Sequence, residues 1–148
     1  MITRVSLLFA VLGLSSCEPN LVDDPIPLAS FSDVIINPSF PEYTDLNRDG
    51  GFKDISNLKG AGVRGIIVYR KSATSFFAFE KNCSYTPNEA CATVEVHSSG
   101  LFMIDPCCGS SFSFEDGMPS GGPAWRPLRQ YRTQFDGGVL TITEEILN

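Results

Sequence analysis

The residues of this chain that could do chemistry gather in its second half, where four cysteines lie close together in the sequence. They are Cys83, Cys91, Cys107 and Cys108, with Tyr85 and Asp105 beside them. Thiolate, phenolate and carboxylate groups can each bind iron or another metal ion, and two thiols can instead join as a disulfide. Metal binding and disulfide formation are therefore the two chemistries that this stretch offers.

Two other chemistries find less support in the spacing of the residues. Structural zinc sites usually contain two close cysteine pairs with about two to four residues between the members of a pair, and neither half of that spacing occurs here. The only histidine is His97, and no glycine-serine elbow is present, so a nucleophilic serine or cysteine has no base beside it. We expect that the chain is not an enzyme.

Four cysteines are also the even number expected of two disulfides in an oxidising compartment. Of the three possible connectivities, the one that joins the neighbours Cys107 and Cys108 is disfavoured, because a ring closed across one peptide bond is strained. The other two connectivities stay open from the residues alone. Each bridge would stabilise the fold by about 3 kcal/mol, because it restricts the unfolded chain.

The elements that must position these cysteines are predicted to be β-strands. Short apolar runs rich in branched and aromatic residues alternate with clusters of Gly, Pro, Asn and Ser, which is a strand pattern. The expected strands are Val34–Ile36, Gly65–Tyr69, Phe76–Phe79, Ala92–Val96, Leu101–Ile104, Tyr131–Phe135 and Val139–Ile142. The segments 97–100 and 136–138 have the composition of hairpin turns. The predicted fold class is all-β, and the first hairpin should bring the loops of Cys83 and Cys108 together.

Two short segments resemble the cluster-binding boxes of the Rieske family, in which two cysteines and two histidines hold a [2Fe-2S] centre. The segments are Asn82–Tyr85 and Asp105–Phe112. Cys83 matches the first cysteine of the family, and Tyr85 stands at its first histidine. Asp105 stands at the second cysteine, and Cys108 at the second histidine. Because an anionic ligand set would lower the potential and weaken the cluster, an ordinary Rieske centre is excluded.

The resemblance extends over most of the chain and implies small antiparallel sheets with the two boxes at one end. The other matching segments are 65–70, 77–80, 112–117, 122–128 and 139–142. In some Rieske proteins an extra cysteine in each box forms a disulfide between the boxes. Cys107 matches the second cysteine of that pair, and the resemblance implies Cys91 as its partner. A second disulfide, Cys83 with Cys108, would then take the place of the cluster.

An intact member of the family transfers single electrons through its cluster, and the missing imidazoles indicate that this chain has lost that function. We expect a binding or structural module with two disulfides, no cofactor and a protein partner that the sequence does not name. The alternative is an electron-transfer protein with a [2Fe-2S] cluster held by a non-standard ligand set that includes Cys83 and Cys108.

One further motif, Asp45–Gly50, matches the opening of a calcium-binding loop, where oxygen ligands alternate and a glycine permits the sharp turn. The twelfth position of such a loop should be a glutamate and is Ser56 here. No pair of helices is predicted around it. We therefore interpret this segment as a polar glycine turn.

The N-terminal residues have the pattern of a signal peptide. Met1–Ser16 contains an apolar run that is too short to span a bilayer as a helix. Leu14–Cys17 resembles the bacterial lipobox, in which the cysteine is acylated. We therefore expect lipid on Cys17, an acidic proline-containing tether over residues 17–32, and a folded domain over residues 33–148. This places the protein in the bacterial cell envelope, at the periplasmic face or on the cell surface.

The charge of the chain disfavours two classes of partner. The sequence contains 11 basic and 17 acidic residues among 148, a formal net charge of −6. An acidic chain with scattered arginines is not expected to bind nucleic acid or an anionic membrane surface. Contact with a membrane is expected through the lipid alone.

Overall fold

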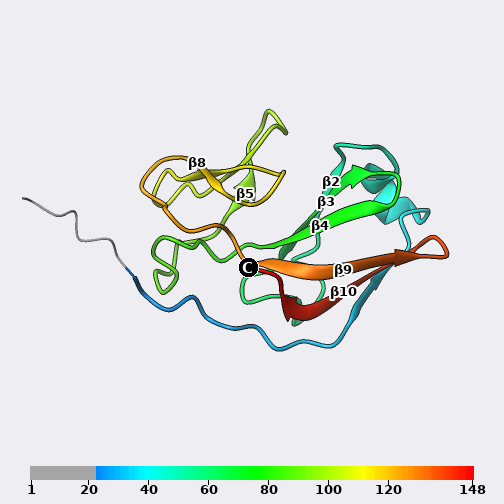
Figure 1. Ribbon diagram of the computed structural model, residues 1–148, viewed down its shortest axis with the longest axis horizontal. Helices are drawn as coiled ribbons and strands as arrows, with labels where there is room; N and C mark the ends of the chain where they lie inside the picture. Colours follow the sequence, from blue (N-terminus) through cyan, green and yellow to red (C-terminus); the bar gives the residue numbers. More distant parts are fainter. Residues whose placement is uncertain (1–22) are drawn as a thin grey trace, which may run out of the picture.

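The computed structural model describes residues 23–148, and these form two antiparallel β-sheets (Figure 1). One sheet has six strands in the order β1, β10, β9, β4, β3, β2. They are β1 (Val34–Ile36), β2 (Phe52–Asp54), β3 (Ile66–Ser72), β4 (Ser75–Glu80), β9 (Gln130–Asp136) and β10 (Val139–Ile146). The other sheet has four strands in chain order: β5 (Glu95–Val96), β6 (Met103–Ile104), β7 (Ser111–Phe112) and β8 (Pro119–Gly121). The predicted all-β class is confirmed.

Five of the predicted strands lie where the sequence pattern placed them, and two are shorter than expected. The shortened strands are β5 and β6. Residues 92–94, the expected start of β5, pair with the segment 81–83. Leu101 and Phe102, the expected start of β6, belong to the hairpin turn, which is closed by a bond of 3.0 Å from the N–H of His97 to the carbonyl of Phe102. Three strands, β2, β7 and β8, and one 3-10 helix, η1 (Pro41–Asn47), are not predicted by the sequence pattern. Strands of two or three residues are too short to show an alternation that a sequence pattern could reveal.

The six-stranded sheet is buried on both faces along its centre. Side chains alternate between the two faces of a strand. On β3, Ile66 and Val68 belong to the first hydrophobic core and Ile67 to the second. On β4, Ala78 belongs to the first core and Phe79 to the second. This explains why the first half of β3, Ile66–Tyr69, is continuously apolar where a strand with one solvated face would alternate.

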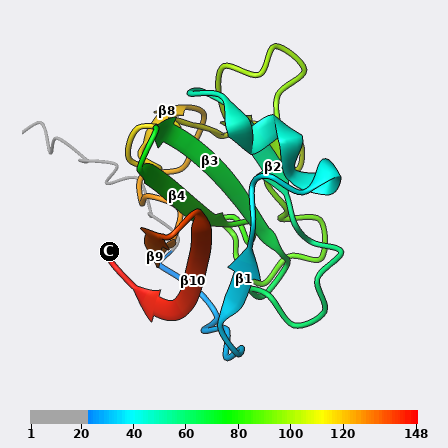
Figure 2. The same cartoon turned by 90° about the vertical axis from the view of Figure 1, so that its right-hand side faces the viewer.

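The first core lies within the curl of the six-stranded sheet, which Figure 2 shows from the side of β1 and β3. Nine of its members are fully buried: Ile36, Leu46, Ile55, Ile66, Val68, Ala78, Tyr131, Leu140 and Ile142. The second core includes residues of both sheets, namely Ile67, Phe79, Cys83, Ala92, Val94, Met103, Phe112, Phe114, Ala124 and Leu128. One of the cysteines, Cys83, is thus a core residue.

Both predicted hairpin turns are confirmed. Strands β5 and β6 are joined by a turn in which the N–H of Gly100 donates to the carbonyl of His97 at 2.8 Å. The imidazole of His97 stacks on Phe102 with 4.3 Å between the ring centroids. Strands β9 and β10 are joined by Gly137 and Gly138, whose φ values of 56° and 80° suit the mirror-image turns of tight hairpins.

The segment that resembles a calcium loop is held by an arginine in the structure. The carboxylate of Asp49 lies 3.3 Å from Nε of Arg70, and the N–H of Gly50 donates to the carbonyl of Arg70 at 2.8 Å. Gly50 has a φ of 79°, which favours glycine. These contacts fit the interpretation of this segment as a polar glycine turn.

The chain packs against the domain before the expected boundary at residue 33. The ring of Phe31 meets that of Tyr131 edge-on at 5.0 Å, and its N–H donates to Glu144 at 3.0 Å. Further upstream, Arg129 donates to the carbonyl of Ile26 at 2.5 Å. Figure 1 shows this segment running below β9 and β10 without secondary structure. The part of the expected tether from residue 23 onward is therefore docked on the domain.

The predicted signal peptide, Met1–Ser16, and the predicted lipid attachment site, Cys17, lie outside the described residues. Between residues 23 and 148, no helix has the length and hydropathy that crossing a membrane requires.

Candidate functional site

The first loop of the candidate site, residues 81–94, is closed at its base by backbone hydrogen bonds. The N–H of Cys83 donates to the carbonyl of Ala92 at 3.1 Å, and the N–H of Val94 donates to the carbonyl of Lys81 at 2.7 Å. Because residues on both sides of the loop belong to the second core, the backbone of Cys83 is fixed by packing as well as by hydrogen bonds.

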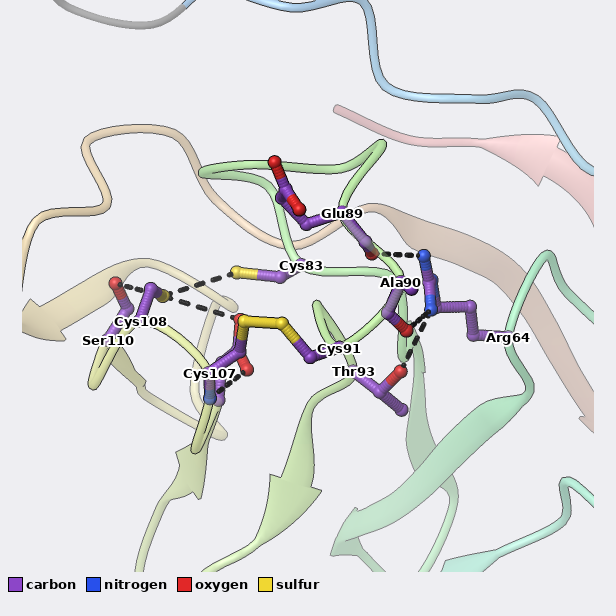
Figure 3. The surroundings of a disulfide bond; sticks show 10 residues. Arg64, Cys83, Glu89, Ala90, Cys91, Thr93, Cys107, Cys108 and Ser110 are labelled. Atoms are coloured by element: carbon purple, nitrogen blue, oxygen red, sulfur yellow. Dashed lines mark hydrogen bonds between the residues drawn. A yellow bond between two sulfur atoms is a disulfide. The ribbon is translucent and has the colours of Figure 1, made fainter.

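One arginine holds the far side of this loop. The guanidinium of Arg64 donates to the carbonyls of Ala90 and Glu89 at 2.7 and 2.5 Å. It also bonds the side chain of Asn82 and, as Figure 3 shows, that of Thr93. A planar guanidinium presents several donors in fixed directions, so one side chain can satisfy both ends of the loop.

The second loop, residues 105–110, is a tight turn between β6 and β7. The N–H of Asp105 donates to the carbonyl of Ser110, and the N–H of Gly109 donates to the carbonyl of Asp105, both at 2.8 Å. The carboxylate of Asp105 also accepts the N–H of Cys107 at 2.8 Å. These bonds turn the side chain of Asp105 back toward the loop that it begins.

A disulfide between Cys91 and Cys107 joins the two loops (Figure 3). This is the bridge that the resemblance implied, and both of its cysteines are exposed. The second expected bridge is not formed, because Cys83 and Cys108 are free thiols whose sulfur atoms lie 3.9 Å apart. The loops are thus held together by one covalent link and face each other with two free thiols.

The free thiols form a cluster with one carboxylate. The Sγ of Cys108 lies 3.3 Å from Oδ2 of Asp105 and 3.1 Å from Oγ of Ser110. One ligand atom each of Cys83, Asp105 and Cys108 lies within 4.8 Å of the other two. Among residues 23–148, this is the one group of three or more histidine, cysteine, aspartate or glutamate side chains close enough to share a metal ion. We call it the Cys2Asp cluster.

The surroundings of the Cys2Asp cluster oppose negative charge. Cys83 and Asp105 are fully buried, and Cys108 is half-buried. Burial, together with the hydrogen bond to Asp105, raises the pKa of the Cys83 thiol. None of the five ion pairs within residues 23–148 includes Asp105. A buried carboxylate without a cationic neighbour is costly unless hydrogen bonds or a metal ion compensate it.

The other residues considered from the sequence lie in different surroundings. Tyr85, at the position of the family's first histidine, is half-buried and packs against the second core. His97 lies in the β5–β6 turn, where its Nδ1 is bonded to Ser99 at 2.9 Å. The imidazole that the Rieske boxes require is therefore not supplied from elsewhere in the described chain.

A third loop, residues 122–128, covers the first two. Ser84 donates its hydroxyl to the carbonyl of Arg126 at 2.7 Å, and the guanidinium of Arg126 donates to the carbonyl of Ser84 at 2.6 Å. The N–H of Ala124 donates to Oγ of Ser110 at 3.0 Å. This loop therefore fixes the residue next to Cys83 and the serine that contacts Cys108.

Three side chains that organise the site are absent from the sequence prediction: Arg64, Ser110 and Arg126. The position of Ser110, directly after a glycine that follows the two cysteines, is a signal that could have identified it. The sequence gives no comparable signal for the two arginines. Each donates to backbone carbonyls, and these are present in every residue, so no residue type marks the partner.

Searches for relatives give only distant structural likenesses. No family model and no curated protein matches the sequence. A chain from the complex of reduced oxygenase and oxidized ferredoxin in carbazole 1,9a-dioxygenase is 23% identical, with a TM-score of 0.46, over 68% of this chain and 87% of that one. The ferredoxin of carbazole 1,9a-dioxygenase from Nocardioides aromaticivorans IC177 is 20% identical, with a TM-score of 0.46, over 66% of this chain and 88% of that one. Likenesses this distant say nothing of what this chain binds.

The residues of the Cys2Asp cluster do not fit a [2Fe-2S] centre. The resemblance puts Cys83 and Cys108 on different irons, so two metal–sulfur bonds of about 2.3 Å and the spacing of the irons would have to separate their sulfur atoms. The observed distance is 3.9 Å. Such a centre also needs four ligands, whereas three side chains of the histidine, cysteine, aspartate and glutamate types gather here.

Proposed function

We propose that this chain is an exported, lipid-anchored module of the bacterial cell envelope, with a Rieske-like domain that carries no [2Fe-2S] cluster. The protein then acts by binding, or as a structural module, and not as an enzyme or an electron carrier. The single observation that carries this proposal is the 3.9 Å between the sulfur atoms of Cys83 and Cys108, which is shorter than the separation of two sulfur ligands on the different irons of a cluster.

Two features support a rigid binding module. The Cys91–Cys107 disulfide and the clamp of Arg64 hold the loops in one arrangement without a metal centre. Such a disulfide persists in an oxidising compartment outside the cytoplasm. The export pattern of residues 1–16 and the disulfide thus both support the proposed location in the cell envelope.

The proposal is tested by purifying the full chain in detergent without oxygen and measuring iron and acid-labile sulfide. We expect a colourless protein with neither. About two irons and two sulfides per chain, with the electron paramagnetic resonance signal of a reduced cluster, would instead establish the electron-transfer alternative with its non-standard ligands.

The lipid anchor is tested separately with the variant Cys17→Ser. The parent protein should fractionate with membranes and dissolve only in detergent, because acyl chains bind bilayers in proportion to their buried methylenes. The variant should lose the lipid mass and leave the membrane fraction. A parent protein without lipid on residue 17 would contradict the anchoring.

A further inference from the structure

We infer that the Cys2Asp cluster is a site for a single thiophilic, tetrahedrally coordinated divalent cation, Zn²⁺, bound by Cys83, Cys108 and Asp105. The inference rests on the proposed absence of a [2Fe-2S] cluster and names what the module binds. It departs from the sequence pattern, which disfavoured zinc because no close cysteine pair is present.

The spacing of the donor atoms matches one tetrahedral ion. With Zn–S bonds of about 2.3 Å and a tetrahedral angle, two thiolates on one ion lie about 3.8 Å apart. The sulfur atoms of Cys83 and Cys108 are 3.9 Å apart. A thiolate and a carboxylate oxygen on the same ion lie about 3.5 Å apart. The observed distance from Sγ of Cys108 to Oδ2 of Asp105 is 3.3 Å.

The deprotonated donors of the cluster would need a cation. Once both thiols release their protons, two thiolates and a carboxylate carry three negative charges, two of the three side chains are fully buried, and no arginine or lysine is paired with Asp105 in the described structure. A divalent ion would neutralise most of this charge. Sulfur ligands select zinc over the hard cations calcium and magnesium, which prefer oxygen. On binding, the ion replaces the protons of the two thiols, and these protons pass to solvent.

The donors are held in place before any ion arrives. Cys83 is fixed by its backbone bond to Ala92 and by the second core. The carboxylate of Asp105 is oriented by the N–H of Cys107, and Cys108 is contacted by Ser110, which the third loop fixes in turn. Hydrogen bonds that orient metal ligands raise the affinity of a site.

The site leaves one coordination position open. Three protein donors provide three of the four ligands of a tetrahedral ion, and the neighbouring residues Pro106, Cys107 and Gly109 are exposed. Zinc sites with three protein ligands complete their coordination with water or a bound molecule. An ion here would therefore be accessible from solvent and exchangeable.

The experiment is a titration of the full chain in detergent with Co²⁺, which reports tetrahedral thiolate coordination by its absorption, followed by displacement with Zn²⁺. The protein is first treated with a chelator and kept free of reductant, so that the Cys91–Cys107 bridge stays closed. We expect one Co²⁺ per chain, thiolate-to-cobalt charge-transfer bands, and complete displacement by one Zn²⁺.

Variants assign the ligands. Cys83→Ser and Cys108→Ser should each abolish the charge-transfer band of their thiolate. Each should also weaken Co²⁺ binding by at least about 100-fold, because losing a residue that only hydrogen-bonds to a metal ligand already weakens binding by up to about 100-fold. Asp105→Asn should weaken binding by about 10- to 100-fold. The control is His97→Ala, which removes the only imidazole and should change nothing. If a cysteine variant fails to fold, slower alkylation of both thiols in the Zn²⁺-loaded parent protein gives the same answer.

The outcomes separate the two proposals. Absent cobalt bands, unchanged binding in Cys108→Ser, or a Cys83–Cys108 disulfide found by mass spectrometry of the isolated protein would overturn the zinc site and leave the cluster-free module standing. Iron and sulfide at about two each per chain would overturn both.

Discussion

The hydroxyl of Tyr131 donates a hydrogen bond of 2.7 Å to Oε2 of Glu80, and both side chains are fully buried. The same carboxylate accepts the N–H groups of Val63, Arg64 and Asn82 at 2.7 to 3.0 Å. These four donors compensate the buried charge of Glu80. They also fix the backbone at the start of the first loop and at the arginine that clamps it.

Replacing Tyr131 by phenylalanine should destabilise the domain by about 1–3 kcal/mol at pH 8, because the buried carboxylate of Glu80 loses one of its donors. Denaturant unfolding of the full chain in detergent measures this loss. Tyr69→Phe is the matched control, since Tyr69 is only half-buried and contributes through ring stacking on Phe114. Equal stability of the two variants would contradict the role of the hydrogen bond.

The same hydrogen bond predicts a pH dependence. Burial and the neighbouring Glu80 raise the pKa of Tyr131. Above the ordinary tyrosine pKa of about 10, the unfolded chain releases this proton while the native state keeps it, so the contribution to stability is present below that pH and is lost as pH rises. The difference in unfolding free energy between parent and Tyr131→Phe should therefore shrink above about pH 10. A difference independent of pH would contradict this.

Contacts between residues close together in the sequence can be predicted from it, whereas contacts between separate loops cannot. The hairpin through residues 97–100 is local, and its turn composition correctly brings the two loops together. The contact between Cys83 and Cys108 is not local, because each residue is oriented by its own loop. Zinc-site spacing rules describe cysteines that share one turn, so they miss a pair assembled from two turns.

The sequence also does not predict that Cys83 and Cys108 are free thiols. An even number of cysteines predicts pairing, but whether two thiols are bonded or merely adjacent depends on how each loop places its cysteine, and here the two sulfur atoms lie 3.9 Å apart. Asp105 also changes the chemistry, because a carboxylate beside two thiols makes a ligand set that a disulfide would remove. Sequence spacing does not show that these three groups meet.

The disulfide between Cys91 and Cys107 should stabilise the domain by about 3 kcal/mol, because it closes a loop with a sequence separation of 16 residues. The double variant Cys91→Ser/Cys107→Ser should show this loss in denaturant unfolding. Dithiothreitol should destabilise the parent by the same amount, because the exposed bridge is accessible to reductant. It should have no effect on the double variant, and an effect there would mean that another disulfide exists.

Arg64→Lys should loosen the first loop without unfolding the domain. Lysine keeps the charge but lacks the planar fork that reaches Asn82, Glu89 and Ala90 together. We expect faster amide hydrogen exchange over residues 82–92 and a loss of about 1.5–3 kcal/mol, the range for hydrogen bonds to a charged group. Arg48→Lys is the control at an exposed arginine and should leave exchange in the loop unchanged.

Gly122→Ala should displace the third loop from the site. A Cβ at this position would lie 2.5 Å from Cα of Ser110 and 2.6 Å from the carbonyl oxygen of Gly109, so the second loop would have to move. The backbone of Gly122 also has a φ of 79°, which alone costs a residue other than glycine about 1–2 kcal/mol.

Gly138→Ala separates these two costs, because Gly138 has a φ of 80° and open space where a Cβ would be. We expect Gly122→Ala to be less stable than Gly138→Ala by a further 1–3 kcal/mol or so, the usual cost of overpacking. Alkylation of Cys108 should also be faster in Gly122→Ala alone, since a displaced Ser110 no longer covers that thiol. Equal losses of stability and equal alkylation in the two variants would show that the third loop does not hold the site.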